Sequence, residues 1–160
     1  MFSKIKSITI PSELIDLKEC WCHYTQNLTK ISVSPKNPRY CCIDDEMIVG
    51  KTNIEQSNYD CLVFCVRNIK HIKLPNFIEH ICPSSFCHCN QIKYIEISNE
   101  SKLQTIGKGA FFYSIIKSIS IPSSVTFIGE NAFDCCIQIQ IIEINNINMM
   151  PEIQTCFLNC

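Results

Sequence analysis

The sequence is built on a repeat of about 23 residues, and a repeat of this length confines a chain to a solenoid of stacked turns. The clearest turn runs from Ile119 to Ile142 and contains the motif IPSSVTFIGENAFDCC. Counts that start at Pro11, Pro75 and Pro122 place apolar residues at five shared offsets, which chance seldom produces. Self-similarity of this kind predicts turns that bury their apolar side chains between neighbours.

Each turn begins with a short strand in which apolar residues alternate with outward-facing ones. Six such strands are expected, at Ile8–Ile10, Ile31–Val33, Ile72–Leu74, Ile95–Ile97, Ile119–Ile121 and Ile142–Ile144. We expect them to lie side by side in chain order as one parallel ladder. A second extended piece, such as Val125–Ile128, and a compact helical turn, such as Ala132–Phe133, should follow each strand.

The spacings between these strands are 23, 41, 23, 24 and 23 residues, so the one long step indicates an insertion at about residues 34–68. It opens with SPKNPRY, whose prolines and asparagine favour a loop. Met47–Val49 and Leu62–Phe64 are then predicted as short strands, joined by the polar, turn-rich segment GKTNIEQSNYD. The expected result is an antiparallel hairpin that projects from the solenoid.

Phenylalanines recur at one offset, at Phe86, Phe133 and, with a one-residue shift, Phe111. A large apolar side chain repeated in this way should lie between its own turn and the next, as part of the core. Glycines also recur, at Gly107 and Gly129, and they are expected to take backbone angles that strain other residues.

The motif I-x-I-P-S-x-V-x-x-I-G-x-x-A-F-x-x-C resembles the signature of BspA-like leucine-rich repeats, the surface-antigen type found in bacteria and anaerobic protists. The resemblance extends from Ile5 to the end of the chain. It implies a right-handed superhelical β-solenoid of about six turns, a single domain over residues 1–160 with a truncated last repeat. It also implies surface adhesion or host-matrix binding, although function lives in sites that are grafted on folds.

Composition narrows the class of partner. The net charge is −1, and acidic and basic residues are interspersed, so no footprint for nucleic acid is present. No apolar run reaches the roughly 18 residues that a membrane-spanning helix needs. The opening MFSKIKSITIPS lacks the apolar core of a signal peptide. We therefore expect a protein ligand, with self-association through the open C-terminal end as a further possibility.

Thirteen cysteines are many for a chain of 160 residues. Several follow the repeat, and buried cysteine packs as a small hydrophobe, so reduced core thiols are favoured over disulfides. Cys89, Cys136 and Cys160 share one offset and are expected to be buried and unpaired. Their apolar surroundings should raise the thiol pKa, so a thiol-dependent enzyme is the remote alternative and a catalytic residue is not assigned.

Two cysteine–histidine clusters, Cys20-Trp21-Cys22-His23 and Cys87-His88-Cys89, raise the question of a metal. Zinc sites usually space their thiolates with two to four intervening residues, whereas both clusters here have the C-x-C spacing. The repeat offset turns Cys89 inward, so Cys87 should point elsewhere, and His88 is expected to be a solvated turn residue. On these grounds the sequence assigns neither metal nor cofactor.

The outward residues of the six strands form the candidate binding surface, because extended solenoid faces commonly bind proteins. By alternation they are Ser7, Thr9, Lys30, Ser32, His71, Lys73, Tyr94, Glu96, Ser118, Ser120, Ile141 and Glu143. The predicted site is the central group His71, Lys73, Tyr94, Glu96, Ser118 and Ser120. The expected function is a non-catalytic module that binds protein through this face or the hairpin, on the cell surface or, alternatively, as an intracellular scaffold.

Overall fold

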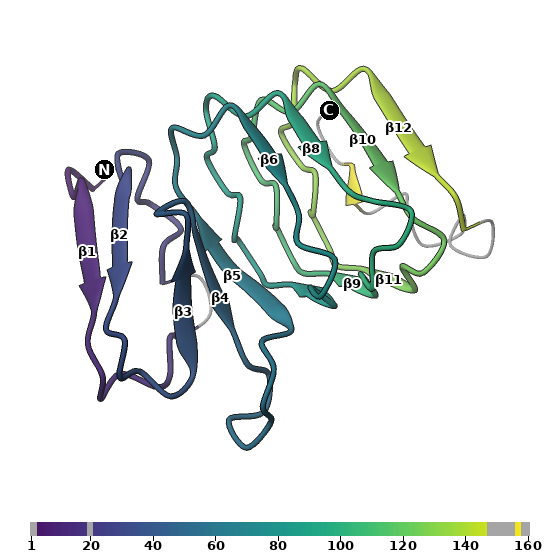
Figure 1. Ribbon diagram of the computed structural model, residues 1–160. Coiled ribbons are helices and arrows are strands. Elements are labelled where there is room, and N and C mark those ends of the chain that lie inside the picture. Colours follow the sequence, from purple (N-terminus) through teal and green to yellow (C-terminus); the bar gives the residue numbers. More distant parts are fainter. Residues whose placement is uncertain (1–2, 19–20, 147–155, 158–160) are drawn as a thin grey trace.

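The computed structural model describes residues 3–18, 21–146 and 156–157, and it is a β-solenoid of about six turns (Figure 1). The strands are β1 (Ser7–Ile10), β2 (Lys30–Val33), β3 (Tyr40–Ile43), β4 (Met47–Gly50), β5 (Cys61–Cys65), β6 (His71–Lys73), β7 (His80–Ile81), β8 (Tyr94–Glu96), β9 (Thr105–Ile106), β10 (Ser118–Ile121), β11 (Phe127–Ile128) and β12 (Ile141–Ile144). They form three sheets, of two, four and six strands.

All six predicted repeat strands are present, and each pairs in parallel with at least one neighbour in the predicted order. β1 pairs with β2, and β6, β8, β10 and β12 form a four-stranded sheet with Ile72 opposite Ile95 and Ile119 opposite Ile142. The expectation of one uninterrupted ladder is wrong, because β2 and β6 do not pair. The insertion separates them, because its strands β3, β4 and β5 lie between β2 and β6 (Figure 1).

The second extended piece of each turn forms a separate parallel ladder of β7, β9 and β11. Here the insertion joins the solenoid: β5 pairs in parallel with β7, and β5, β4 and β3 are antiparallel. The predicted hairpin is therefore present as β4 and β5, with β3 as an additional strand. It does not project as a unit, because every residue of β5 is buried, and only the β4–β5 connection extends away from the sheets (Figure 1).

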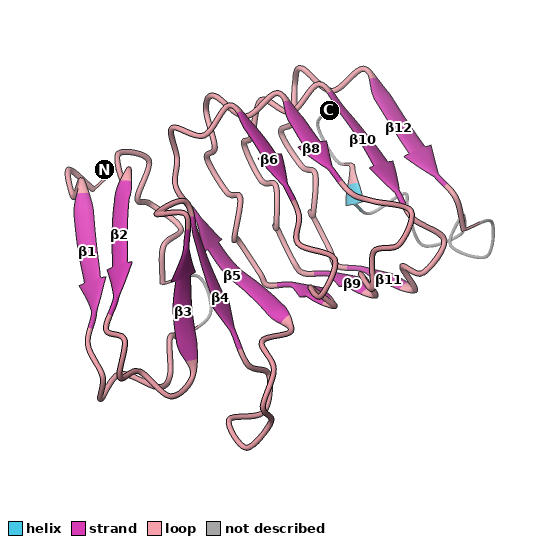
Figure 2. Ribbon diagram, in the orientation of Figure 1, coloured by secondary structure: helices cyan, strands magenta, loops and turns pink. Residues whose placement is uncertain are grey.

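The compact turns between the two ladders are hydrogen-bonded turns and not the expected helical ones. The described residues contain no α-helix, and the short helical piece drawn in cyan is a 3-10 turn at Cys156 (Figure 2). In the third repeat the amide of Cys87 donates to the carbonyl of Ser84, and that of Cys89 donates to Phe86. Ser84 and His88 have positive φ angles, of 59° and 58°. A right-handed helix cannot continue through left-handed residues, so each turn ends after a few bonds.

Gly107 and Gly129 are needed for space, and the prediction of unusual backbone angles at these positions is wrong, since Gly109 is the glycine with positive φ. A Cβ atom added to Gly129 would lie 2.5 Å from the backbone nitrogen of Lys108 in the preceding turn. At Gly107 it would lie 2.6 Å from the nitrogen of Pro83. Successive turns therefore approach too closely at this offset for a side chain.

A stack of phenylalanine rings runs through the core. Phe86, Phe111, Phe133 and Phe157 follow one another with centroid separations of 4.9, 4.9 and 5.0 Å and nearly parallel planes. The first three side chains are fully buried, which confirms their prediction as core residues. Cys89 and Cys136 are also buried, and no disulfide joins two of the described cysteines, whereas Cys160 lies outside the described residues.

The phenylalanine stack ends at Phe86, and a buried arginine fills the space toward the first repeat. Arg67 is 2% exposed; it donates to the carbonyls of Ser85 (2.9 Å) and Cys22 (3.3 Å) and lies 3.6 Å from Cys89 Sγ. Its guanidinium also lies over the Phe64 ring, 4.5 Å from the centroid. We call this contact of residues 21–28 with residues 84–89 around Arg67 the N-terminal seam.

Arg67 changes the acidity of the surrounding thiols. Burial raises the pKa of Cys22 to about 11, as expected for a thiol in the core. Burial also acts to raise the pKa of Cys89, but a hydrogen bond from Cys65 and the charge of Arg67 outweigh it and lower that pKa to about 7. The expectation of a raised pKa is therefore wrong for Cys89, because the sequence pattern did not reveal a cation in the core.

The stack predicts where the solenoid unfolds first. Phe→Ala in a core typically destabilises by about 3–5 kcal/mol, and in a solenoid the loss falls on one turn and its two interfaces. Phe133→Ala should fray the C-terminal turns and leave residues 3–106 protected, whereas Phe86→Ala should weaken the whole array. Hydrogen exchange on the two variants measures the difference, and uniform loss of protection in both would contradict the assigned register.

Candidate binding surface

The predicted surface residues lie on one face of the four-stranded sheet, in two rows that cross the strands. His71, Tyr94 and Ser118 are register partners on β6, β8 and β10. Lys73 and Glu96 are partners in the second row. The residues between the rows, such as Ile95, are buried, as expected for alternation in a sheet with one face on the core.

Charge and aromatic area lie next to each other on this face. Lys73 Nζ and Glu96 Oε1 form an ion pair at 3.0 Å, with side chains that are 66% and 51% exposed. Tyr94, in the neighbouring row, is 50% exposed. A tyrosine held on a rigid strand beside a charged pair offers a partner both apolar contact and a hydrogen-bonding hydroxyl.

Five of the six predicted site residues line one open depression of about 400 Å³, and the sixth, Lys73, adjoins it through its ion pair with Glu96. The five are His71, Tyr94, Glu96, Ser118 and Ser120. Ile141 and Glu143 from β12 also line it, as do the largely buried Ile95 and Ile119, and Ile141 is 56% exposed. Sequence alternation had placed Ile141 and Glu143 on the same face but outside the predicted site.

The N-terminal part of the face is separate. Ser7, Thr9, Lys30 and Ser32 lie on the two-stranded sheet, where Thr9 Oγ1 and Ser32 Oγ are 2.8 Å apart. They line a depression of their own, of about 410 Å³, together with Asp45. Because β2 and β6 do not pair, the twelve predicted outward residues belong to two surfaces and not one.

A third and larger hollow, of about 700 Å³, lies beside the β4–β5 connection. It is lined by residues of that connection, including Tyr59 and Asp60, together with Phe77, Glu79 and Lys102 from the array. Burial acts to raise the pKa of Asp60, but hydrogen bonds from Gln56 and Thr52 outweigh it and lower the pKa. The sequence analysis named the hairpin as an alternative binding contact but assigned no site residues here. The polar segment 50–60 is the sequence feature that could have indicated this hollow.

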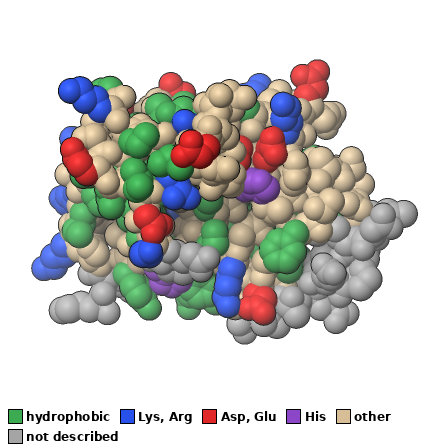
Figure 3. Space-filling model, turned by 90° about the horizontal axis from the view of Figure 1, so that it is seen from below, with side chains coloured by type: hydrophobic (Ala, Val, Ile, Leu, Met, Phe, Trp, Pro, Cys, Tyr) green, Lys and Arg blue, Asp and Glu red, His purple; other side chains and the backbone are tan. Residues whose placement is uncertain are grey.

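Charges of both signs are interspersed on the underside of the molecule, where Lys and Arg alternate with Asp and Glu among apolar side chains (Figure 3). Within the described residues, no helix is long and apolar enough to cross a membrane.

Comparison with known families agrees with the strand pattern. Residues 52–160 match the profile described as the BspA type leucine rich repeat region, in six copies. The chain belongs to the BspA-type leucine-rich repeat family. Leucine-rich repeat proteins are typically non-catalytic, and the fold is suited to protein binding. No curated protein matches the sequence.

Solved structures of low identity share the fold. A leucine-rich repeat protein from Eubacterium ventriosum is 21% identical with a TM-score of 0.75, and the match covers 89% of this chain and 37% of that one. The pneumococcal vaccine antigen PcpA is 18% identical with a TM-score of 0.64, and the match covers 90% of this chain and 40% of that one. A leucine rich cell surface protein from Faecalibacterium prausnitzii is 20% identical with a TM-score of 0.52, and the match covers 95% of this chain and 51% of that one. The chain thus spans about half of these proteins or less.

The geometry of the face predicts that its residues contribute little to stability. Lys73 and Glu96 are exposed, and such ion pairs contribute about 0–1 kcal/mol. Lys73→Ala and Tyr94→Ala should therefore change the free energy of unfolding by less than about 1 kcal/mol. Ile95 follows Tyr94 on β8 and its side chain is buried, so Ile95→Ala should destabilise the fold by about 2–5 kcal/mol. Urea denaturation measures all three, and a large loss in the surface variants would show that these residues hold the fold.

Proposed function

We propose that the protein is a non-catalytic module that binds another protein through the face formed by His71, Lys73, Tyr94, Glu96, Ser118 and Ser120. The observation that carries the proposal is the convergence of five of these side chains on one open depression over a rigid parallel sheet, with Lys73 joined to it through its ion pair with Glu96. Their positions are fixed by strand register before any partner arrives, so binding need not order the backbone and loses less entropy.

The chemistry of this face favours a protein over a small molecule. The depression is open, and it combines an exposed tyrosine, an exposed isoleucine and an ion pair within two rows. Tyrosine is enriched among residues that dominate binding energy at protein interfaces. Small-molecule sites are instead concave and enclose most of their ligand.

The finer part of the proposal is that the module acts in adhesion at a cell surface. Its support is the family membership and the description of the Faecalibacterium protein as a cell surface protein, with PcpA described as a vaccine antigen. Labelling of intact cells with a membrane-impermeant reagent tests this part. Labelling only after lysis would instead identify the protein as an intracellular scaffold, with the same binding face.

The non-catalytic part rests on the placement of the thiols. Cys89, whose pKa is lowered to about 7, is fully buried and contacts Arg67 at the centre of the N-terminal seam. A nucleophile needs access to its substrate as well as a low pKa. A broad activity-based cysteine probe should therefore leave the folded protein unlabelled at Cys89, and rapid labelling there would revive the thiol-dependent alternative.

The binding face is tested with matched triple variants. The variant Lys73→Ala, Tyr94→Ala, Glu96→Ala should lose its partner in affinity capture, because it removes the ion pair and the aromatic contact together. The control Thr9→Ala, Lys30→Ala, Ser32→Ala alters the separate N-terminal face and should retain the same partner. Loss in the control alone, or capture by both variants, would remove the central face as the binding site and direct attention to the hairpin hollow.

A further inference from the structure

The two cysteine–histidine clusters of the sequence meet in the structure. The compact turn of the first repeat lies against that of the third: Cys22 Sγ donates to the carbonyl of Ser84 at 3.8 Å, and Gln26 Nε2 is 3.3 Å from His88 Nδ1. The second repeat has no compact turn to separate them, because its chain is drawn into the extended strand β5. Residues more than 60 positions apart therefore come into contact.

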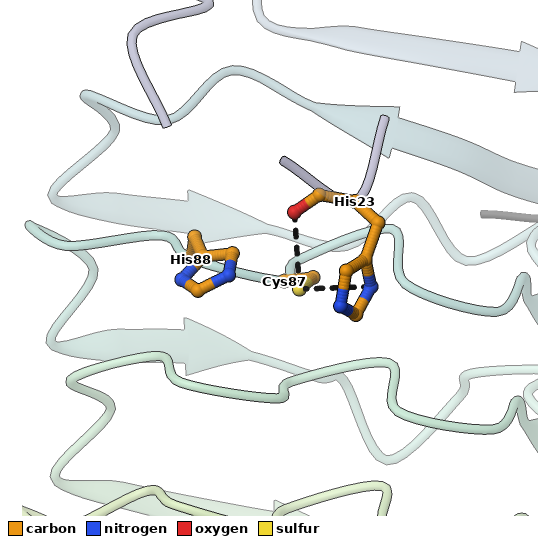
Figure 4. A group of neighbouring side chains, drawn as sticks. All are labelled: His23, Cys87 and His88. Atoms are coloured by element: carbon orange, nitrogen blue, oxygen red, sulfur yellow. Dashed lines mark hydrogen bonds between the residues drawn. The ribbon is translucent and has the colours of Figure 1, made fainter. Parts of the chain in front are cut away.

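One ligand-type side chain from the first cluster and two from the second gather at this contact. His23, Cys87 and His88 each offer one nitrogen or sulfur atom, and these three atoms lie within 4.8 Å of one another. Figure 4 shows the two imidazoles on opposite sides of the Cys87 sulfur, and His23 Nδ1 is 3.7 Å from that sulfur. His88 was expected in solvent, and this is wrong: it is 5% exposed, and Cys87 is fully buried.

We propose that His23, Cys87 and His88 form a binding site for a thiophilic divalent cation, Zn²⁺ being the ion of matching chemistry. One thiolate and two imidazoles are ligands that zinc takes in proteins, with bonds of about 2.0–2.3 Å. Two such ligands on a tetrahedral ion lie about 3.3–3.6 Å apart. The sulfur-to-His23 distance of 3.7 Å is already close to this value, and the other distances, which do not exceed 4.8 Å, need to shorten by at most about 1.5 Å.

The surroundings prepare these groups for a metal. His88 is 5% exposed and its ring stacks on Tyr113, so the imidazole is held in one place beside the Cys87 sulfur. Its Nδ1 lies 3.3 Å from Gln26 Nε2, and its other ring nitrogen is on the side of Cys87 (Figure 4). If the amide of Gln26 is turned to present its oxygen, it accepts from Nδ1–H and fixes the tautomer that binds metal.

The proton balance and access are also consistent with the site. Binding replaces the thiol proton of Cys87, which leaves to solvent, by the metal. The rings of Phe112 and Tyr113 stack on His23 and His88 and shield the cluster. Of the three proposed ligands, His23 is part-exposed and the other two are buried, so an ion can reach the site from the side of His23. Three protein ligands leave one tetrahedral position for water.

The consequence of such a site is a clamp across the N-terminal seam. A metal would join the first repeat to the third, at the place where the regular phenylalanine stack is absent. Since an ion that binds only the folded state stabilises it by mass action, the first repeat should be the part whose protection depends on metal.

The probe is Co²⁺, which takes zinc sites and reports thiolate ligation by a charge-transfer absorption in the near ultraviolet. The full chain is stripped with a chelator, kept reduced and titrated. We expect about one equivalent to bind with this band and to be displaced by Zn²⁺. In Cys87→Ser the band should disappear, and in His23→Gln and His88→Asn the affinity should fall more than about tenfold. Asparagine is chosen for His88 because it tolerates positive φ.

The control is Cys41→Ser, Cys42→Ser, which removes two part-exposed thiols outside the cluster and should bind as the unaltered protein does. His23→Gln changes only a part-exposed side chain, so it keeps the test valid if the buried variants fail to fold. Zinc should also slow hydrogen exchange in residues 21–28 of the unaltered protein but not of His23→Gln. The proposal is overturned if the band is absent, if it survives in Cys87→Ser, or if the control removes it.

Discussion

The contact between one turn and the next at the phenylalanine offset is the interaction on which the solenoid depends. Phe86, Phe111 and Phe133 each bury a ring against the ring of the neighbouring turn, with centroids 4.9 Å apart. That separation matches the spacing of paired strands, so both ladders and the ring stack can share one repeat. The glycines Gly107 and Gly129 permit the approach, because a Cβ atom there would meet the backbone of the preceding turn.

Most of the correct predictions came from the 23-residue repeat. It located the six repeat strands and the core phenylalanines, because each of these depends only on its own turn and the next. The features that were not predicted lie in the insertion and at the N-terminal seam, where the repeat is interrupted. Tyr40–Ile43 shows no alternation with polar residues, so β3 was not predicted. The direction of Cys87 was inferred from the repeat offset of Cys89, but the side chain is buried against His23, which is 64 residues away in the sequence. No local pattern encodes a contact of that kind.

At the N-terminal seam the repeat has no phenylalanine at its usual offset. At the phenylalanine offset the first turn has Cys22, a smaller side chain, and Trp21 packs instead on Phe64 at 5.3 Å. Arg67 occupies the remaining space, although its Nε has no hydrogen-bond partner among the described residues. A buried cation is costly unless neighbouring groups compensate it. Two carbonyls, the Phe64 ring and the Cys89 sulfur provide that compensation, which explains why a core position in an apolar array holds a polar cluster.

The same insertion that creates the seam also determines the binding surface. Residues 34–68 join the six-stranded sheet, in which β5 pairs with β7. As a result β2 does not pair with β6, and the outward face is divided in two. The central face keeps four strands in register and therefore holds Tyr94, Lys73 and Glu96 at fixed separations. A chain with an uninterrupted ladder would present one long, uniform strip. The insertion instead confines the proposed binding face to a short patch, so under that proposal specificity would depend on the side chains of β6, β8, β10 and β12 more than on the length of the solenoid.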